Sequence, residues 1–136
     1  MSEPGTSSAA PRRRVLVVDD QPLIGFGLQR MMGDDFDVDL HEDAELALKD
    51  LQDGKRWDAI LCDVMMPEVD GVEFHERLVA IDAGQAARTL FMSGGGYTPR
   101  TEAFLKVMKE RVLEKPFTPE LLRERLEQVF QRSSGA

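Results

Sequence analysis

Short apolar runs alternate with longer amphipathic stretches along most of the chain. Five runs rich in Val, Leu, Ile and Phe have the length of strands: "RVLVVDD", "FDVDL", "DAILCD", "RTLFMS" and "RVLE". Five stretches with apolar residues at helical spacing lie between and after them: "PLIGFGLQRMM", "DAELALKDLQDG", "VDGVEFHERLVAI", "TEAFLKVMKE" and "TPELLRERLEQVFQR". This alternation predicts an α/β fold, in which helices cover both faces of a parallel sheet through right-handed crossovers.

Local signals indicate where several of these helices begin and end. Asp43 and Thr118 are expected N-caps, and Pro119 suits the first position of the last helix. Gly54 is expected to end the second helix. The stretch "GGGYTPR" is expected to be a flexible loop after the fourth strand.

Length and composition suit one globular domain, because the chain has 136 residues, of which 42% are hydrophobic and 31% charged. We expect residues 1–13 to form a disordered leader, residues 14–132 the folded domain and residues 133–136 a tail. The run Arg12 to Arg14 is expected to be a solvated lead-in to the first strand. Few residues follow the last helix, so we expect output through protein contacts and not through a further domain.

The net charge, the absence of long apolar stretches and the single cysteine argue against several classes of partner and location. A formal net charge of −8 argues against a nucleic-acid partner. No apolar stretch approaches the ~20 residues that cross a bilayer, and no signal peptide is recognisable, so no membrane partner is expected. Cys62 is expected to be a buried core residue. By elimination, the expected location is cytoplasmic.

Chemically useful side chains stand where four of the predicted strands end. They are Asp19 and Asp20, Asp63, Ser93, and Lys115 within "EKP". Each of these also has an ordinary explanation. The two acids after the first strand could start a helix, and Asp63 could form a turn. Ser93 could be a polar loop residue, and Lys115 could be an exposed lysine at a strand end. In parallel sheets, however, ligands bind beyond the carboxyl ends of the strands, where these side chains would meet.

The combination indicates a site for a phosphorylated group. Clustered carboxylates repel and raise one another's pKa, and Mg²⁺ would relieve that repulsion while keeping room for a phosphoryl oxygen. Lys115 adds positive charge, Ser93 adds a hydroxyl donor, and the glycines after it expose backbone N–H groups. Asp63 is within reach as a nucleophile.

Four motifs resemble those of the two-component response-regulator receiver domain: "VLVVDDQP", "DAILCDVMMPEVDGVEF", "LFMSG" and "VLEKPFTPELL". They agree in order, spacing and strand context. The resemblance implies a flavodoxin-like (βα)5 three-layer sandwich with strand order 2-1-3-4-5. The chain is similar to single-domain, chemotaxis-type regulators, and "MSGGGYTPRTEAFL" is similar to receivers of hybrid histidine kinases.

The resemblance also implies a function in phosphorelay signalling. Asp63 would accept a phosphoryl group from a phosphohistidine on a sensor histidine kinase or a histidine phosphotransfer protein. The chain would be a signalling phosphoacceptor, not an enzyme acting on other substrates, and would switch a downstream protein target or pass the group along.

The same resemblance assigns roles around Asp63. Mg²⁺ would be bound directly by Asp20, Asp63 and the main-chain carbonyl of Met65, with Asp19 acting mostly through water. Ser93 would donate a hydrogen bond to the phosphoryl group. Lys115 would form an ion pair with Asp63 before transfer and with the phosphoryl group after it. A cis peptide bond is expected before Pro116.

One position departs from the family pattern. Many receivers have an aromatic residue three positions before the lysine, where this chain has Val112. Tyr97, in the glycine-rich loop after Ser93, would either take over part of that role or pack on the surface.

Other functions remain open on the sequence. A Mg²⁺-dependent phosphohydrolase with an aspartyl nucleophile would need an acid where Met65 stands, two residues after Asp63. A pseudo-receiver would act without phosphorylation, which the intact acidic set argues against. "HERL", beginning at His75, superficially resembles a kinase phosphoacceptor box, but we expect a surface histidine. Gly25 and Gly27 lack the third glycine of a dinucleotide-binding motif.

By family analogy, output would use the face of the fourth predicted helix, the fifth strand and the last helix. Four basic residues are candidate contacts there: Arg100, Lys106, Lys109 and Arg123.

Overall fold

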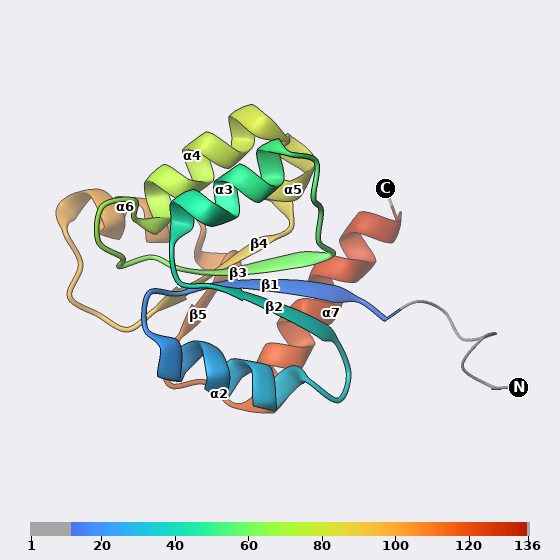
Figure 1. The fold of residues 1–136 in the computed structure, drawn as a ribbon. Helices are drawn as coiled ribbons and strands as arrows, with labels where there is room; N and C mark the ends of the chain where they lie inside the picture. Colours follow the sequence, from blue (N-terminus) through green and yellow to red (C-terminus); the bar gives the residue numbers. More distant parts are fainter. Residues whose placement is uncertain (1–11, 136) are drawn as a thin grey trace, which may run out of the picture.

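The computed structural model describes residues 12–135, and its centre is a parallel sheet between two layers of helices (Figure 1). Residues 1–11 of the expected leader, and Ala136 of the expected tail, lie outside this range. The strands are β1 (Arg14–Val18), β2 (Asp37–His41), β3 (Ala59–Asp63), β4 (Thr89–Ser93) and β5 (Val112–Glu114). Their order is β2-β1-β3-β4-β5, and every pair is parallel, as predicted.

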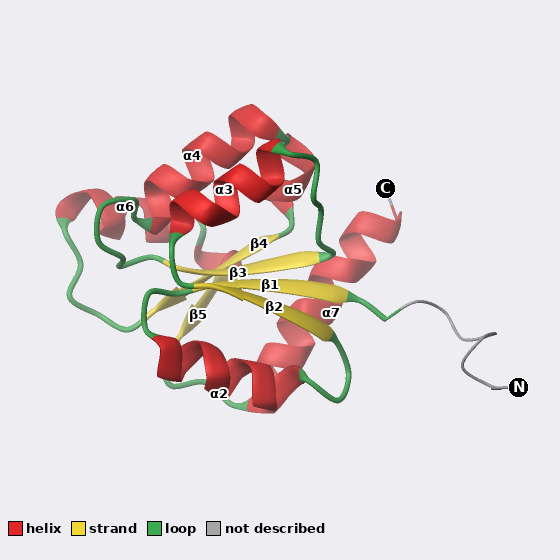
Figure 2. Ribbon diagram, in the orientation of Figure 1, coloured by secondary structure: helices red, strands yellow, loops and turns green. Residues whose placement is uncertain are grey.

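Two helical layers cover the sheet, as Figure 2 shows. One layer contains α3 (Ala44–Gln52), α4 (Gly71–Ile81), α5 (Ala83–Ala87) and α6 (Pro99–Val107), followed by a 3₁₀ turn, Lys109–Arg111. The other contains α2 (Pro22–Met32) and α7 (Pro119–Gly135), which continues past the expected end at Arg132. None of the described helices is long and apolar enough to cross a membrane.

Side-chain alternation along the strands divides the interior into two apolar cores. On β3, Ile60 and Cys62 pack under α3 and α4, whereas Ala59 and Leu61 pack against α2 and α7. Because both faces are covered, the central strand β3 is buried along its whole length and lacks a polar face, whereas the edge strand β2 alternates polar and apolar residues and is partly exposed. The expectation that Cys62 is a buried core residue is confirmed.

The predicted helix starts at Asp43 and Thr118 are confirmed. The Asp43 carboxylate accepts a hydrogen bond from the Glu45 amide at 2.8 Å, and the Thr118 hydroxyl accepts one from the Leu121 amide at 3.0 Å. Each side chain therefore satisfies a backbone donor that the first helical turn leaves without a partner.

The expected flexible loop "GGGYTPR" is shorter than predicted. Helix α6 begins at Pro99, because Thr98 and Thr101 form a reciprocal capping box in which each side chain accepts from the other's amide. Helix α5 was not predicted, since its five residues carry no apolar period. Instead, its Gln85 is buried and hydrogen-bonds both the amide and the carbonyl of Trp57, at 3.0 and 2.7 Å.

Arg12 to Arg14 are exposed, as expected of a solvated lead-in to β1, but they also make specific contacts. Arg12 donates to the carbonyls of Gly33 and Phe36, at 2.7 and 2.8 Å. The Arg13 guanidinium lies 4.8 Å from the ring centre of Phe130. The three arginines hold the start of β1 against three different elements, because charged heads with long apolar stems can bridge over apolar surface.

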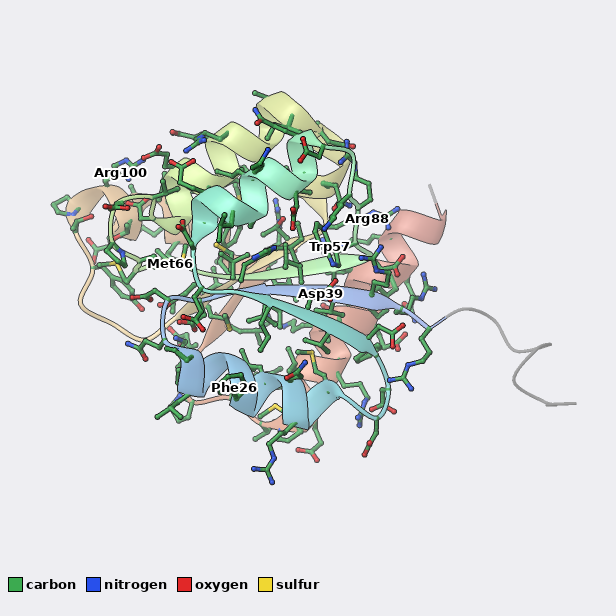
Figure 3. All side chains as sticks on the ribbon, viewed as in Figure 1. Phe26, Asp39, Trp57, Met66, Arg88 and Arg100 are labelled. Atoms are coloured by element: carbon green, nitrogen blue, oxygen red, sulfur yellow. The ribbon has the colours of Figure 1, made fainter. Side chains whose placement is uncertain are left out.

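Arg14 takes part in a cluster at the amino edge of the sheet. Its guanidinium lies 5.4 Å from the Trp57 ring centre and 3.3 Å from Asp39. Trp57 also donates its ring N–H to Asp39 at 2.9 Å, so the buried indole has its polar atom satisfied; both residues are labelled in Figure 3.

Gly71 marks the tightest backbone approach after β3. A Cβ atom there would lie 2.8 Å from Val64 Cα and 3.1 Å from the Asp63 carbonyl oxygen. The Gly71 amide also donates to the Val64 carbonyl at 2.9 Å. Only glycine lets α4 start this close to the chain that follows Asp63.

We predict that Gly71→Ala lowers the free energy of unfolding by roughly 1–3 kcal/mol, because backbone atoms must move to admit the methyl group. Gly27→Ala is the matched control. Gly27 is exposed on helix α2, and a Cβ added there would meet nothing within 4 Å, so the change should stabilise by about 0.5–1 kcal/mol. Urea denaturation of both variants measures the difference, and equal effects would contradict this account.

Candidate functional site

Three carboxylates from two strands meet at the carboxyl edge of the sheet. Asp19 and Asp20 follow β1, and Asp63 is the last residue of β3. One ligand oxygen of each lies within 4.8 Å of the others, and Asp19 and Asp63 are buried. The structure therefore brings together acids that are more than forty residues apart in the sequence.

Asp63 is held by the strand and by its own loop. Alternation along β3 places it on the same side as Ala59 and Leu61, toward α2 and α7. Its carboxylate accepts a hydrogen bond from the Met65 amide at 3.4 Å, and the side chain remains only slightly exposed. The acid is fixed, yet it opens onto the surface at one edge of the sheet.

Lys115 reaches the same two buried acids from the end of β5. Its Nζ lies 3.4 Å from Asp63 Oδ2 and 3.5 Å from Asp19 Oδ2. The Lys115 amide donates to the Ser93 carbonyl at 2.7 Å, which fixes the lysine backbone beside β4. The peptide bond between Lys115 and Pro116 is cis, as expected.

Burial raises the pKa of Asp63 above its ordinary value, because the ionised form is poorly solvated there. Lys115 opposes this effect, and the neighbouring charge of Asp19 adds to it. Asp19 Oδ2 and Asp20 Oδ1 are buried without a hydrogen bond among the described residues, although Asp19 Oδ2 pairs with Lys115. An all-oxygen set with two such atoms fits a hard divalent cation.

Ser93 ends β4 but does not face the carboxylates. Its hydroxyl makes a hydrogen bond with the phenol of Tyr97. Alternation along β4 places Ser93 on the side of Phe91, under α4 and α6, which is the face opposite to Asp63. The Tyr97 side chain is partly exposed, as expected of a residue that packs on the surface, but its hydroxyl also contacts Ser93.

A groove of about 690 Å³ leads to Asp63 along α2. Its walls are largely apolar and come from α2 and from the segment after β5: Leu23, Ile24, Leu28, Met31 and Phe117. Met65, Gly94 and Gly95 complete the end nearest the acids. The groove therefore connects the surface of α2 with Asp63.

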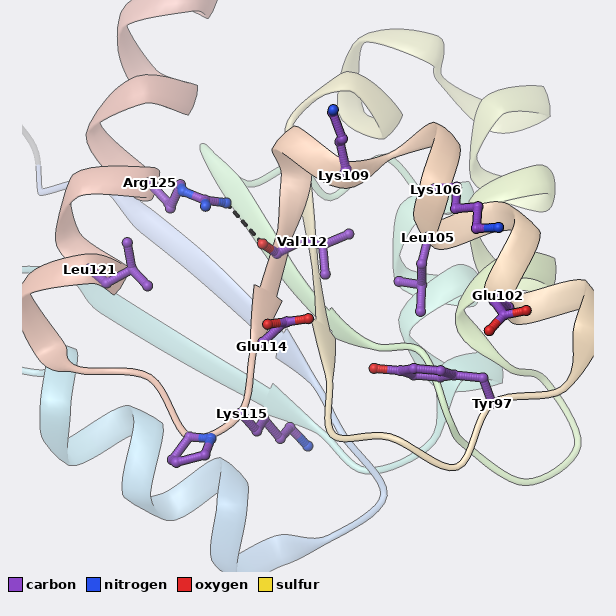
Figure 4. A pocket seen from close by; sticks show the side chains of 11 residues that line it. Tyr97, Glu102, Leu105, Lys106, Lys109, Val112, Glu114, Lys115, Leu121 and Arg125 are labelled. Carbon is purple, nitrogen blue, oxygen red and sulfur yellow. Dashed lines mark hydrogen bonds between the residues drawn. The ribbon is translucent and has the colours of Figure 1, made fainter.

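A second cavity, of about 1010 Å³, lies between α6, β5 and α7 (Figure 4). Lys106, Lys109 and Arg125 line it. Arg100 and Arg123 do not line it, and their exposed side chains pair with Asp70, at 2.6 Å, and with Asp35. That Arg100, Lys106, Lys109 and Arg123 contact an output partner stays a prediction.

The expectation of a surface histidine at His75 is also corrected. His75 is half-buried on α4, and its ring lies 5.7 Å from the ring centre of Phe91 and 5.6 Å from that of Phe104. Its pKa is lowered, first by burial and then by the charge of Arg111, with Glu76 opposing. The side chain is part of an aromatic cluster and not of a phosphoryl site.

Comparisons with known proteins agree with this arrangement. The sequence matches the family model of the response regulator receiver domain over residues 15–127. It is 33% identical over 122 residues to "Response regulator MprA" of a Mycobacterium species, covering 89% of this chain and 52% of that protein. It is 32% identical over 110 residues to "Response regulator Rre1" of Synechocystis, covering 79% and 47%. The chain thus spans about half the length of the curated relatives it matches.

Solved structures support the same fold. A CheY-like receiver domain from Methanospirillum hungatei superposes with a TM-score of 0.79 at 18% identity, covering 92% of this chain and 98% of that one. Full-length FixJ from B. japonicum gives 0.78 at 26% identity, covering 91% of this chain and 60% of that one.

We predict that His75 makes the protein less stable at acidic pH. A histidine pKa that folding lowers means that protonation favours the unfolded chain, so stability falls as pH drops through the ordinary value of 6.5. His75→Gln should remove that loss. Urea denaturation of both proteins at about pH 8 and about pH 5 measures it. If the difference in free energy of unfolding between the two proteins is the same at both pH values, His75 is not the group responsible.

Proposed function

The chain belongs to the response regulator receiver domain family, and we propose that it is a phosphoacceptor in two-component signalling, with Asp63 as the accepting residue. The observation that carries this proposal is the pairing of a buried Asp63 with Lys115 at 3.4 Å, beside two further acids. A carboxylate that is both fixed and offset by a cation is suited to attack an anionic group.

In the proposed reaction, a carboxylate oxygen of Asp63 attacks the phosphorus of a phosphohistidine on the donor protein. A phosphorus–oxygen bond forms while the phosphorus–nitrogen bond breaks, and the imidazole leaves with the electron pair. Lys115 offsets charge on the carboxylate before transfer and on the phosphoryl oxygens after it. The product is an acyl phosphate, whose hydrolysis by water restores Asp63.

The groups that would hold Mg²⁺ are Asp19, Asp20 and Asp63 together with the main-chain carbonyl of Met65. Their fit is supported by the two buried carboxylate oxygens that have no hydrogen bond among the described residues. When bound, Mg²⁺ supplies positive charge that offsets the three acids and the transferred group.

The donor we propose is a sensor histidine kinase or a histidine phosphotransfer protein. The apolar groove along α2 ends at Asp63, so a helix of the donor lying there would bring its phosphohistidine to the carboxylate. Downstream, a protein target would contact the cavity between α6, β5 and α7, where Lys106, Lys109 and Arg125 supply positive charge.

Hydrolytic turnover is less well supported than phosphoacceptance. A phosphohydrolase needs an acid close to the nucleophile to protonate the leaving group. Met65 occupies the position two residues after Asp63, and its amide is hydrogen-bonded to that carboxylate. We therefore propose a signalling role and not catalysis on other substrates.

Incubation with acetyl phosphate and Mg²⁺ tests the acceptor directly. We expect a gain of one phosphoryl mass on the intact protein by mass spectrometry, and its loss in Asp63→Asn. Asp53→Asn is the matched control, because Asp53 is an exposed acid at the end of α3 whose ion pair is with Lys49. It should be labelled like the wild type.

The same experiment separates the competing functions. Continuous release of phosphate at many turnovers without a stable adduct would favour the phosphohydrolase. No adduct and no release would favour a pseudo-receiver. Equal labelling of Asp63→Asn would mean that the accepting residue lies elsewhere.

Mg²⁺ should also stabilise the fold. At about one hundred times its Kd, a ligand that binds only the native state adds ~2.7 kcal/mol to the free energy of unfolding. We expect this increment in the wild type and in Asp53→Asn, and its loss in Asp20→Asn. Thermal or urea unfolding with Mg²⁺ and with EDTA measures the effect. An increment in Asp20→Asn equal to that of the wild type would contradict the proposed ligand set.

A further inference from the structure

Met65 carries an oxidisable side chain that the proposed phosphotransfer does not use. The residue follows Asp63 by two positions, and its amide donates to that carboxylate at 3.4 Å. It is partly exposed and, together with Met31, lines the groove that leads from α2 to Asp63. Because a thioether is a nucleophile that oxidants convert to a sulfoxide, an accessible one beside the accepting acid is a candidate site of modification.

Burial and hydrogen bonding distinguish Met65 from most other methionines. Met108 is partly exposed as well, but its sulfur accepts a hydrogen bond from the Arg111 guanidinium at 3.5 Å. Three methionines are buried, with 2%, 8% and 0% of their surface exposed: Met32, Met66 and Met92. Among the described residues, the methionines that are both partly exposed and free of such a bond are therefore Met31 and Met65, and both line the groove.

The thiol of Cys62, the residue before Asp63, is protected from oxidation. Cys62 is fully buried, and burial raises the pKa of its thiol well above the ordinary value. The thiolate is the form that reacts with oxidants, and it is not populated here. A small oxidant in solution therefore meets the exposed thioethers first.

The groove admits such an oxidant without any movement of the chain. Its volume of about 690 Å³ far exceeds the ~30 Å³ that a water molecule occupies in the liquid, and hydrogen peroxide is only slightly larger than water. The residues on either side of Met65, Val64 and Met66, are buried, so the loop does not need to open for the groove to be entered.

A sulfoxide at Met65 would change the polar surroundings of Asp63. Its oxygen accepts hydrogen bonds and carries partial negative charge. The side-chain N–H donors that line the groove are those of Gln21 and Lys115. Lys115 Nζ lies 3.4 Å from Asp63 Oδ2, so a sulfoxide that binds this lysine draws the cation away from the acid. A sulfoxide without a donor would add an acceptor beside three carboxylates. In both cases an anionic phosphoryl donor approaches less favourably.

We propose that Met65 is an oxidation site, and that its sulfoxide slows the phosphorylation of Asp63. The inference rests on the proposed function and concerns the regulation of that same site. The oxidant is a peroxide: the sulfur lone pair attacks a peroxide oxygen, so that a sulfur–oxygen bond forms and the oxygen–oxygen bond breaks. With hydrogen peroxide, the departing hydroxide takes the proton of the transferred oxygen and leaves as water. Sulfur is oxidised by two electrons, and the peroxide is reduced.

Limited treatment of the full chain with hydrogen peroxide, followed by peptide mass spectrometry, tests the site itself. We expect Met65 and Met31 to gain one oxygen before the buried methionines do. Met66 is the matched internal control, because it belongs to the same loop but is buried, and fragment spectra distinguish it from its neighbour. Oxidation of Met66 as fast as that of Met65 would mean that the groove does not govern access, and would overturn the assignment.

The rate of labelling by acetyl phosphate and Mg²⁺, measured before and after peroxide, tests the consequence. In the wild type, oxidation should slow labelling by about twofold to tenfold, which corresponds to one hydrogen bond gained by the lysine. Treatment with methionine sulfoxide reductase should restore the rate, and this control needs no substitution. In Met65→Leu the ratio of the two rates should be one, whereas Met31→Leu and Met108→Leu should be slowed as the wild type is.

The outcomes separate this inference from the proposed function. Unchanged labelling of protein oxidised at Met65, slowing that the reductase does not reverse, or equal slowing in Met65→Leu would each refute the inference and leave the phosphoacceptor role intact. Failure of the untreated wild type to be labelled would refute the proposed function, and with it this inference, because no phosphorylation would remain to be regulated.

Discussion

Repulsion among the carboxylates of Asp19, Asp20 and Asp63 is the constraint on which the rest of the site depends. The fold holds them at one sheet edge, and Lys115 offsets part of their charge by reaching two of them at 3.4 and 3.5 Å. The raised pKa of Asp63 reflects burial more than its charged neighbours. A cluster of this kind is stable only because the surrounding sheet is rigid, and it is suited to receive further positive charge.

That rigidity comes from two apolar cores packed on opposite faces of the sheet. The parallel register places the ends of β1, β3 and β4 side by side, and the close approach of Gly71 to Val64 determines where the chain turns after Asp63. At the amino edge, arginines and Trp57 make long-range contacts that hold β1, so the two edges of the sheet have different roles. Side chains at the amino edge stabilise the fold, and side chains at the carboxyl edge form the candidate site.

A short series of contacts connects the end of β4 to the surface. Ser93 contacts Tyr97, Tyr97 lies beside Val112 and Leu105, and the cavity they line opens between α6, β5 and α7. Arg100 couples the start of α6 to Asp70, the residue that caps α4. The end of β4 and the start of α4 are therefore both in contact with residues of the loop and helix that border this cavity.

The sequence by itself determined the strands, the long helices, the helix starts at Asp43 and Thr118, and the acids and lysine at the strand ends. These features depend on residue order and on the period of apolar positions, both of which are local. The tertiary structure decided that Arg100 and Arg123 pair with Asp70 and Asp35, that His75 is half-buried between aromatic rings, and that Gln85 of α5 is buried and bonded to Trp57. Each of these depends on a partner distant in the chain, and the local pattern carries no record of that partner.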